Sequence, residues 1–482
     1  MEKYFNKITW FFWLALVAVL PITSMPLVAK ILHSSEVAPA SVIFLLLLCI
    51  TWLPAYVIKK GTFPVQVKVA LAFLGVSLIA TGASFFLNIP AYKDQKLTSS
   101  VLSGVVTMVL GILFYLLTTA MPNSSEKVKT TLKVLNWGGF AMLFWDFVVW
   151  FISTVSHTDT PSYLRAVQHL ISTTTFFGFR SVGFAAEPSW LAHILNMVYL
   201  PYWLSATVCG FTAQKKKLWK FSFENFLLVF GAVILYKTIS RAGLFAFLLI
   251  LGYFFIRLNI WVVKKISQKW SATRWKSLIM IGVVLVMLAV YVGGAVGSFY
   301  FYSKLDKRMK DAFTSLQVLA QSGFSKYAEI LQFGERVTYW QAGWATFNLH
   351  PVLGVGLGNA GYYFQQTLPD NAWQLTEVRH LKYHATNLMN IKSMWIRILA
   401  ETGIAGFSVF LVLLVISLLT ARELTHTKQP MKRTIGFMGI CMLISFIMEG
   451  FSIDSFALPY LWFTLGLVAA TWRWTKPEIE GE

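Results

Sequence analysis

Arginines at the ends of apolar segments are the residues of this sequence best suited to chemistry. Arg241 lies in Ser240-Arg241-Ala242-Gly243, where one long apolar segment ends and the next begins. Ser240 can cap a helix that starts there, and the N–H groups at a helix N-terminus favour anions. Because a guanidinium group binds phosphate oxygens in pairs, Arg241 is a candidate ligand for a diphosphate. The alternative is an interfacial arginine that reaches lipid headgroups.

A second pair of charges, Arg180 and Glu187, comes directly before another apolar segment. A structural salt bridge between them, or a helix N-terminus with Pro188 in its first turn, would explain the pair without a function. The functional interpretation is a second contact for an anion or a sugar at the membrane surface. Both interpretations stay open from spacing alone.

The polar stretch after residue 300 offers Arg336, in Gly334-Glu335-Arg336-Val337-Thr338-Tyr339-Trp340, followed by three histidines, His350, His380 and His384. A neutral histidine near pH 7 can take the proton of a sugar hydroxyl as that hydroxyl attacks. His384, Asn387 and Asn390 would share one helix face if a helix begins this early. The alternative for each histidine is an ordinary polar loop residue.

Several familiar sites are missing from the sequence. There is no P-loop, and the G-x-G-x-x-G at 356–361 follows no strand, so we interpret it as a loop. The predicted outer loops contain no D-x-D or E-x-D pair that would suit a divalent metal. We therefore expect no metal and no cofactor, and arginines would have to neutralise a diphosphate leaving group.

The elements that must position these residues are membrane helices. Of the 482 residues, 56% are hydrophobic, 16% aromatic and 13% charged, and the apolar residues come in blocks of about 20, the length that crosses a bilayer. Inside lipid such blocks must be helices, because every backbone polar group has to be paired within the chain. The predicted spans are 8–31, 38–58, 64–88, 99–121, 134–155, 188–212, 222–239, 242–262, 277–300, 399–421, 434–450 and 456–473.

The net charge of +20 is explained by topology rather than by nucleic acid. Basic residues cluster in alternate loops, which the positive-inside rule places in the cytoplasm together with both termini. These clusters are Lys59–Lys60, Lys127–Lys133, Lys215–Lys220, Lys264–Lys276 and Arg422–Arg433. We therefore predict a multi-pass protein of the cytoplasmic membrane whose candidate site faces outward.

Four parts follow from this topology: a bundle of nine helices over 1–300, an extracytoplasmic loop domain over 301–398, three further helices over 399–475 and a disordered tail over 476–482. Within the loop domain the pattern predicts an amphipathic helix over 304–321 and a second helix over 335–349, broken by His350-Pro351. A final helix is predicted from Thr386 to Thr402, stopped by Gly403.

Together these segments resemble the bacterial O-antigen ligase and polysaccharide polymerase (Wzy-type) superfamily. The resemblance rests on the run from Gly334 to Gly406, which contains Gly-Glu-Arg-Val-x-x-Trp, the His350-Pro351 segment, His384 and Glu401-Thr402-Gly403, and on Ser240-Arg241-Ala242-Gly243. It covers roughly residues 180–474. It implies an all-α, GT-C-like helical bundle with one large extracytoplasmic loop domain.

The resemblance also implies a metal-independent glycosyltransferase whose donor is a glycan on polyprenyl (undecaprenyl) diphosphate. Arg241 and Arg336 would be catalytic and bind the diphosphate, with Arg180 as a further diphosphate ligand and His384 as the base. Glu187, His350 and Asn387 would be substrate-binding residues. Many family members have Asn directly after the histidine, whereas this chain has His384-Ala385-Thr386-Asn387, so His350 and His380 remain alternative bases.

The segment from Arg180 to Ser189 resembles exopolysaccharide and capsule polymerases more than lipid A-core ligases. We therefore predict a polymerase that moves the growing chain onto the next lipid-linked repeat unit, with a flippase and a chain-length regulator as partner proteins besides the membrane lipids. The alternatives are a ligase that moves the glycan to lipid A-core or protein, and a lipid-linked sugar transporter. A transporter would carry ionisable residues near the midplane, of which Asp146 is the clearest here.

Overall fold

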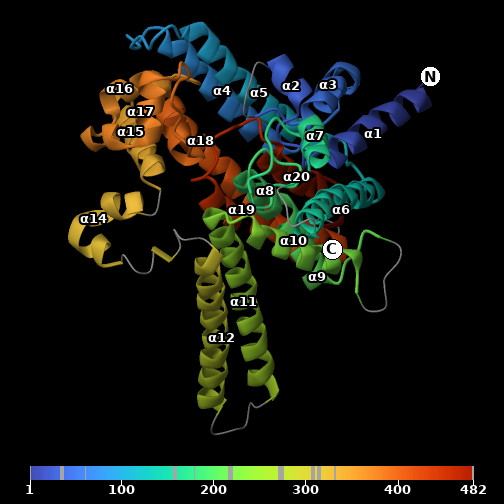
Figure 1. Cartoon of the computed structure of the whole chain (residues 1–482). Helices are drawn as coiled ribbons and strands as arrows, with labels where there is room; N and C mark the ends of the chain where they lie inside the picture. Colours follow the sequence, from blue (N-terminus) through green and yellow to red (C-terminus); the bar gives the residue numbers. More distant parts are fainter. Residues whose placement is uncertain are drawn as a thin grey trace.

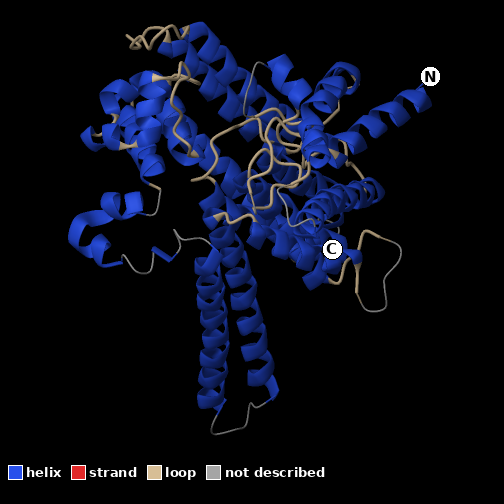
Figure 2. Cartoon of the chain, viewed as in Figure 1, coloured by secondary structure: helices blue, strands red, loops and turns tan. Residues whose placement is uncertain are grey.

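The computed structural model describes residues 2–32, 37–59, 61–155, 160–178, 180–214, 221–269, 276–305, 310–311, 316–330 and 333–479. Over these ranges the chain is a bundle of helices joined by loops (Figure 2), with two isolated bridges, Ser24–Ala38 and Phe177–Arg180, and no sheet. Eight of the described helices are long and apolar enough to cross a membrane. The prediction of an all-α integral membrane protein is confirmed.

The first part of the bundle contains α1 (Glu2–Ala18), α2 (Pro26–Leu32), α3 (Ser41–Ile58), α4 (Val65–Ser84), α5 (Leu97–Ala120), α6 (Ser125–Val155), α7 (Ser162–Ile171), α8 (Pro188–Ile194), the π-helix η1 (Leu195–Tyr199), α9 (Leu200–Cys209) and α10 (Phe223–Lys237). The second part contains α11 (Arg241–Lys269), α12 (Lys276–Leu305), α14 (Leu316–Ile330), α15 (Gly334–Leu349), η2 (Ala360–Tyr363), α16 (Phe364–Thr367), η3 (Asp370–Gln374), α17 (Thr376–Tyr383), α18 (Met394–Thr425), α19 (Pro430–Glu449) and α20 (Pro459–Ile479).

The eight candidate spans are α3, α4, α5, α6, α11, α12, α18 and α19. The other predicted spans coincide with α1 and α2, with the continuous run α8–η1–α9, with α10 and with α20. Helices α11 and α12 run side by side and extend away from the rest of the bundle (Figure 1).

The first predicted span is wrong as a single helix. Instead of running from 8 to 31, the chain breaks after Ala18 and forms the short helix α2 from Pro26. Pro21 and Pro26 explain the break, because each lacks a backbone N–H and its ring clashes with the preceding turn. Met25 N–H instead donates to the carbonyl of Ala38 (2.8 Å), which holds the broken segment against the start of α3.

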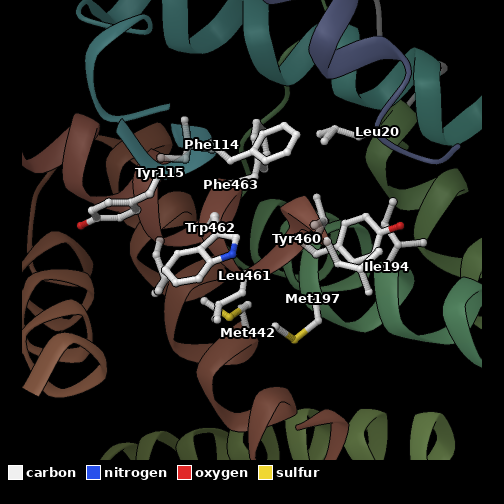
Figure 3. Close-up of a cluster of buried hydrophobic side chains, with 14 of the residues drawn as sticks. Leu20, Phe114, Tyr115, Ile194, Met197, Met442, Tyr460, Leu461, Trp462 and Phe463 are labelled. Atoms are coloured by element: carbon white, nitrogen blue, oxygen red, sulfur yellow. The ribbon is translucent and has the colours of Figure 1, made fainter. Parts of the chain in front are cut away.

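The apolar core of the bundle is built around α20, which packs against α5 and α19. Tyr460, Leu461, Trp462 and Phe463 of α20 are all buried there, beside Tyr115 of α5 (Figure 3). The indole N–H of Trp462 donates to the carbonyl of Phe456 (2.8 Å), so the polar edge of this buried ring is satisfied.

Segments predicted to lie on the same side of the membrane contact one another. The hydrogen bonds that join predicted outer segments include Lys93 Nζ to Leu381 O (2.9 Å), Arg180 Nε to Thr238 O (3.0 Å) and Arg336 Nη1 to Ser452 O (3.0 Å). At the opposite ends of the helices, Arg473 Nη2 donates to Thr62 Oγ1 (2.7 Å). This grouping agrees with the predicted alternation of loops, while the side that faces the cytoplasm stays a prediction.

The segment from 333 to 400 forms a second buried cluster outside the main core, which includes Tyr339, Tyr362 and Phe364. Helix α15 matches the predicted helix over 335–349, and Gly354, Gly356 and Gly358 that follow it all have positive φ. Gly403 also has positive φ (63°), and a Cβ there would lie 2.2 Å from the carbonyl of Val352. The glycine therefore interrupts α18 as predicted and lets the 352–356 loop pack against it.

Two other predictions for this region differ from the structure or lie outside it. Residues 306–309 and 312–315 of the predicted amphipathic helix over 304–321 lie outside the described residues, as do the basic loops over 215–220 and 270–275, while residues 316–321 belong to α14. The predicted disordered tail is helical from residue 476 to Ile479, the last residue of α20. The residues after Ile479 lie outside the described part of the chain.

Candidate functional site

Arg241 and Arg336 both lie near the start of α15. Arg336 is in the first turn of this helix, and Phe333 occupies its N-cap position without a side-chain hydrogen bond. The guanidinium carbon of Arg241 lies 5.9 Å from the centre of the Phe333 ring. One arginine is therefore close to the N-cap residue of α15 and the other is in its first turn, and the N-terminus of this helix has no side-chain cap. Guanidinium groups near a helix N-terminus are suited to binding a phosphate group.

Arg241 is held by the turn that starts α11. The amide N–H of Gly243 donates to Ser240 Oγ (3.2 Å), so the predicted capping by Ser240 is confirmed. Thr238 Oγ1 in turn accepts from the Ser240 amide (3.1 Å), and Ile239 between them has positive φ (51°). Local polar side chains thus fix a tight turn between α10 and α11 and place Arg241 at its end.

Arg336 is held by the loop between α19 and α20. Its Nη1 donates to the carbonyl of Ser452 (3.0 Å), which lies in that loop. The loop is fixed from the other side by α18, because Arg397 donates to the carbonyl of Asp454 (2.6 Å) and pairs with Glu401 (3.0 Å). Arg336 is thus anchored through one nitrogen to a loop that is itself braced by an ion pair.

A buried polar network connects the start of α11, which carries Arg241, with the end of α19, which precedes the loop that holds Arg336. Glu449, the last residue of α19, accepts a hydrogen bond from Asn196 Nδ2 (2.8 Å) and lies 3.4 Å from His193 Nδ1. The same Asn196 nitrogen donates to the carbonyl of Gly243 in the first turn of α11 (2.8 Å). Asn196 lies in the π-helix η1, a distortion that often marks functional sites. The network ties the start of α11 to the end of α19.

Arg180 contacts the backbone of the turn between α10 and α11. Its Nε donates to the carbonyl of Thr238 (3.0 Å) and its Nη2 to that of Ile239 (3.5 Å). The next residues are held by Asp146 of α6, whose carboxylate accepts from Ser181 Oγ (2.7 Å) and from the Val182 and Gly183 amides (3.2 Å each). The mid-span acid Asp146 therefore holds the Arg180 segment.

A cavity of about 720 Å³ opens beside Arg180. Its lining comes from α6, α7, the 172–182 segment and the end of α10. The lining residues are Asp146, Val149, Trp150, Ser153, Thr154, Thr160, Arg165, Thr175, Phe176, Gly178, Arg180, Ser181, Val182, Lys237 and Ile239.

Glu187 is the N-cap residue of α8 and is exposed. Its Oε2 accepts a hydrogen bond from Ser189 Oγ (3.1 Å). Pro188 follows in the first turn of α8, as the sequence predicted. Glu187 thus ends the segment that begins with Arg180, and its predicted role in substrate binding stays a prediction.

The candidate histidines lie at the end of α15 and in and directly after α17. His350 ends α15 with its ring 5.6 Å from that of Tyr363, and the rings of His380 and His384 are 5.8 Å apart. His384 is exposed and directly follows α17. Lys93 Nζ donates to the carbonyl of the next residue, Ala385, so His384 lies beside the 89–98 segment.

The predicted start of the last helix is wrong, because α18 begins at Met394 rather than near Thr386. His384, Asn387 and Asn390 therefore do not share a helix face. The backbone of this stretch bonds to other elements instead: Gln95 donates to the Thr386 carbonyl (2.9 Å) and Asp454 accepts from the Lys392 amide (2.9 Å). Asn387 lies exposed within this loop.

Tyr339 connects Arg336 with the helix that leads to His384. It is one turn after Arg336 on α15, and its hydroxyl donates to Glu377 Oε1 (3.3 Å) on α17, where Lys392 also pairs with Glu377. Burial, followed by the negative charge of Glu377, raises the pKa of Tyr339, so this hydroxyl remains a donor. His384 lies seven residues beyond Glu377, which is about 10 Å along a helix axis.

Residues that the sequence reasoning missed hold the site together: His193, Asn196, Glu377, Lys392, Arg397, Glu401, Glu449 and Asp454. For three of these residues the sequence contains a pattern that could have predicted a structural role. Arg397 and Glu401 are spaced i, i+4, and Glu449 ends an apolar segment. Among the described residues, no group of three or more His, Cys, Asp and Glu side chains is arranged to hold a metal ion.

Residues 226–411 match the protein-family model described as O-antigen ligase. The matched region starts in α10 and ends within α18, so it includes Arg241, Arg336 and the three outer histidines. No match was found among curated protein sequences.

Proposed function

From the match of residues 226–411 to the O-antigen ligase family model, we propose that this chain is a polysaccharide polymerase. It transfers a glycan from polyprenyl diphosphate to the next lipid-linked repeat unit. The observation that carries the proposal is that Arg241 lies close to Phe333, the N-cap residue of α15, while Arg336 is in the first turn of the same helix, which lacks a side-chain cap. The resemblance of the Arg180–Ser189 segment to polymerases favours this acceptor over lipid A-core or protein.

In the proposed reaction a hydroxyl oxygen of the acceptor sugar attacks the anomeric carbon of the donor glycan. The bond from that carbon to the diphosphate oxygen breaks, and its electron pair leaves with polyprenyl diphosphate. Arg241 and Arg336 stabilise the charge that develops on the leaving diphosphate, and Arg180 is a further ligand for a lipid diphosphate. The hydroxyl proton passes to His384 as the base, with His350 and His380 as alternatives. Glu187, His350 and Asn387 contact the sugars.

The site belongs on the extracytoplasmic face of the bacterial cytoplasmic membrane. Support comes from the contacts among segments 89–98, 240–241, 301–398 and 451–455, all of which are predicted to lie outside. Arg180, in the predicted outer segment 156–187, also contacts Thr238 at the predicted outer end of the 222–239 span. A lipid-linked substrate reaches this face after it has been flipped across the membrane. A flippase and a chain-length regulator are therefore the partner proteins that we propose.

The product distribution tests the polymerase assignment. Purified protein is incubated with a synthetic polyprenyl-diphosphate oligosaccharide as the sole substrate, and the products are resolved by size. We expect a ladder of multiples of the repeat unit, because one molecule type serves as donor and acceptor. The assignment is wrong if no ladder forms and transfer begins only when lipid A-core or a protein acceptor is added, since that result identifies a ligase.

A chelator separates the proposed arginine-based mechanism from a metal-dependent one. EDTA is expected to leave the rate of ladder formation unchanged, because Arg241 and Arg336 supply the positive charge that a divalent metal would otherwise provide. The rate is measured before and after dialysis against EDTA, and again after Mg²⁺ or Mn²⁺ is added back. Activity that depends strictly on the added metal contradicts the mechanism.

A further inference from the structure

The cavity beside Arg180 continues into an apolar groove. The groove has a volume of about 650 Å³ and is lined almost entirely by apolar side chains of α6 and α10. Trp150 and Lys237 line both the cavity and the groove, so the two spaces meet at these residues. A polar chamber and an apolar channel that share a wall suit a ligand with a polar head and an apolar chain.

The chamber has an excess of positive charge. Arg165, Arg180 and Lys237 line it, while Asp146 is the acidic residue of its lining. The Asp146 carboxylate already accepts three hydrogen bonds from the 181–183 segment. Lys237 Nζ lies 4.7 Å from the centre of the Trp150 ring, which holds the ammonium at the junction with the groove. The chamber therefore favours an anionic head.

The groove favours a long apolar chain. Phe140, Phe144 and Phe147 line it from α6, and Phe226 and Phe230 line it from α10. Both helices are predicted spans, and Trp150 and Lys237 lie near their predicted outer ends. The groove therefore leads from the membrane interior up to the chamber.

We propose that the chamber and groove bind the acceptor substrate, a second lipid with a diphosphate head and an isoprenoid chain. This inference rests on the proposed polymerase function, because a polymerase must hold two lipid-linked glycans at the same time. The donor diphosphate is assigned to Arg241 and Arg336, and the acceptor diphosphate to Arg165, Arg180 and Lys237. Arg180 is thus the ligand of the second lipid rather than of the first.

In this proposal the turn between α10 and α11 lies between the diphosphate group of the donor lipid and that of the acceptor lipid. Arg180 bonds to the carbonyls of Thr238 and Ile239 on one side of this turn, and Arg241 contacts Phe333 at its end. The acceptor is therefore bound next to the donor and its sugars extend over the turn toward the donor's anomeric carbon. Neither lipid has to leave its site for the hydroxyl to attack.

Stoichiometry of lipid binding tests the site without requiring activity. Native mass spectrometry of the full-length protein with undecaprenyl diphosphate is expected to show two lipids bound to the wild type and one to the double variant Arg165→Gln, Lys237→Gln. Lys127→Gln is the matched control, because Lys127 Nζ also lies over a tryptophan ring (Trp10, 5.4 Å) but at the opposite membrane face, and it should keep two. A single lipid on the wild type, or a second lipid that phosphatidylglycerol displaces equally well, overturns the proposal.

Kinetics identify which substrate uses the chamber. The probe is an acceptor-only analogue in which a methylene group replaces the oxygen between sugar and diphosphate, so that it cannot act as donor. Lys237→Gln is expected to raise the KM for this analogue about tenfold, the order expected for losing one charge-assisted hydrogen bond, and to leave the donor KM unchanged. A rise in the donor KM alone overturns the assignment. If the wild type binds two lipids but transfers no sugar, the polymerase proposal fails and the lipid site stands.

A bulky side chain placed in the groove tests separately whether the groove binds the isoprenoid chain of the acceptor. Val229 lines the groove and is 67% exposed, so Val229→Trp blocks the path of the chain without changing any charge. We expect the KM for the acceptor-only analogue to rise while kcat holds. Val290→Trp on α12, where the valine is 69% exposed, is the control for added bulk on a membrane-facing surface. Equal effects of the two variants contradict the groove assignment.

Discussion

Arg241→Ala and Arg336→Ala are each expected to lower the rate of polymer formation by about 10²–10³-fold, the usual effect of removing one donor that stabilises a developing anion. Arg241 lies close to Phe333, the N-cap residue of α15, and Arg336 is in the first turn of this helix, where the proposed mechanism has both arginines stabilise charge on the leaving diphosphate. The rate is measured by ladder formation with purified protein, and membrane insertion is followed by the amount extracted and by its elution volume. Lysine at either position should restore only part of the rate, because an ammonium group lacks the planar fork.

Arg257→Ala is the matched control for these variants. Arg257 is also on α11, and its guanidinium group also lies over a phenylalanine ring, that of Phe437 (4.6 Å), but sixteen residues further along the helix. Loss of this arginine removes the same charge and the same kind of ring contact far from α15. The diphosphate assignment fails if both Arg241→Ala and Arg336→Ala retain activity, or if Arg257→Ala loses as much as they do.

The parts of the site that could be predicted were those with a local signal. Ser240 precedes an apolar run and caps the helix that follows, so its position alone predicts both the cap and the placement of Arg241. Arg336 falls within a helix whose end at Leu349 is set by the next two residues, His350 and Pro351. The family resemblance, confirmed over residues 226–411, adds the pairing of the two arginines to these local signals.

What could not be predicted depends on contacts between distant segments. The loop over 384–393 looks compatible with helix, but its backbone groups bond to Gln95 and Asp454, which are far away in the sequence. The hydrogen bond from the Asn196 side chain to the carbonyl of Gly243 is a second example. Asn196 lies in a π-helix, and the periodicity of apolar residues in the sequence does not indicate a π-helix there. The break after Ala18 is different, because Pro21 and Pro26 are a local signal for the end of a helix, even though the block as a whole is hydrophobic enough to form one span.

Glu449→Ala is expected to destabilise the protein by about 1–3 kcal/mol, because it leaves buried polar groups of Asn196 and His193 without their acceptor. Glu449, Asn196 and His193 are all nearly inaccessible, at 1%, 0% and 4% exposure, so water cannot replace the lost carboxylate. Thermal unfolding in detergent measures the change. Because the network joins the first turn of α11 to the end of α19, the same variant should also raise the KM for the donor.

Glu449→Gln separates the hydrogen bonds from the charge. The amide oxygen can still accept from Asn196, and its NH₂ group can donate to His193 if the imidazole changes tautomer, so most of the stability should be retained. Recovery of the donor KM together with stability would show that Glu449 positions Arg241 and Arg336 through geometry. A Glu449→Ala protein that unfolds at the wild-type temperature would mean that the network does not hold these two helix ends together, and the anchoring of Arg336 would then rest on α18 and the Arg397–Glu401 pair alone.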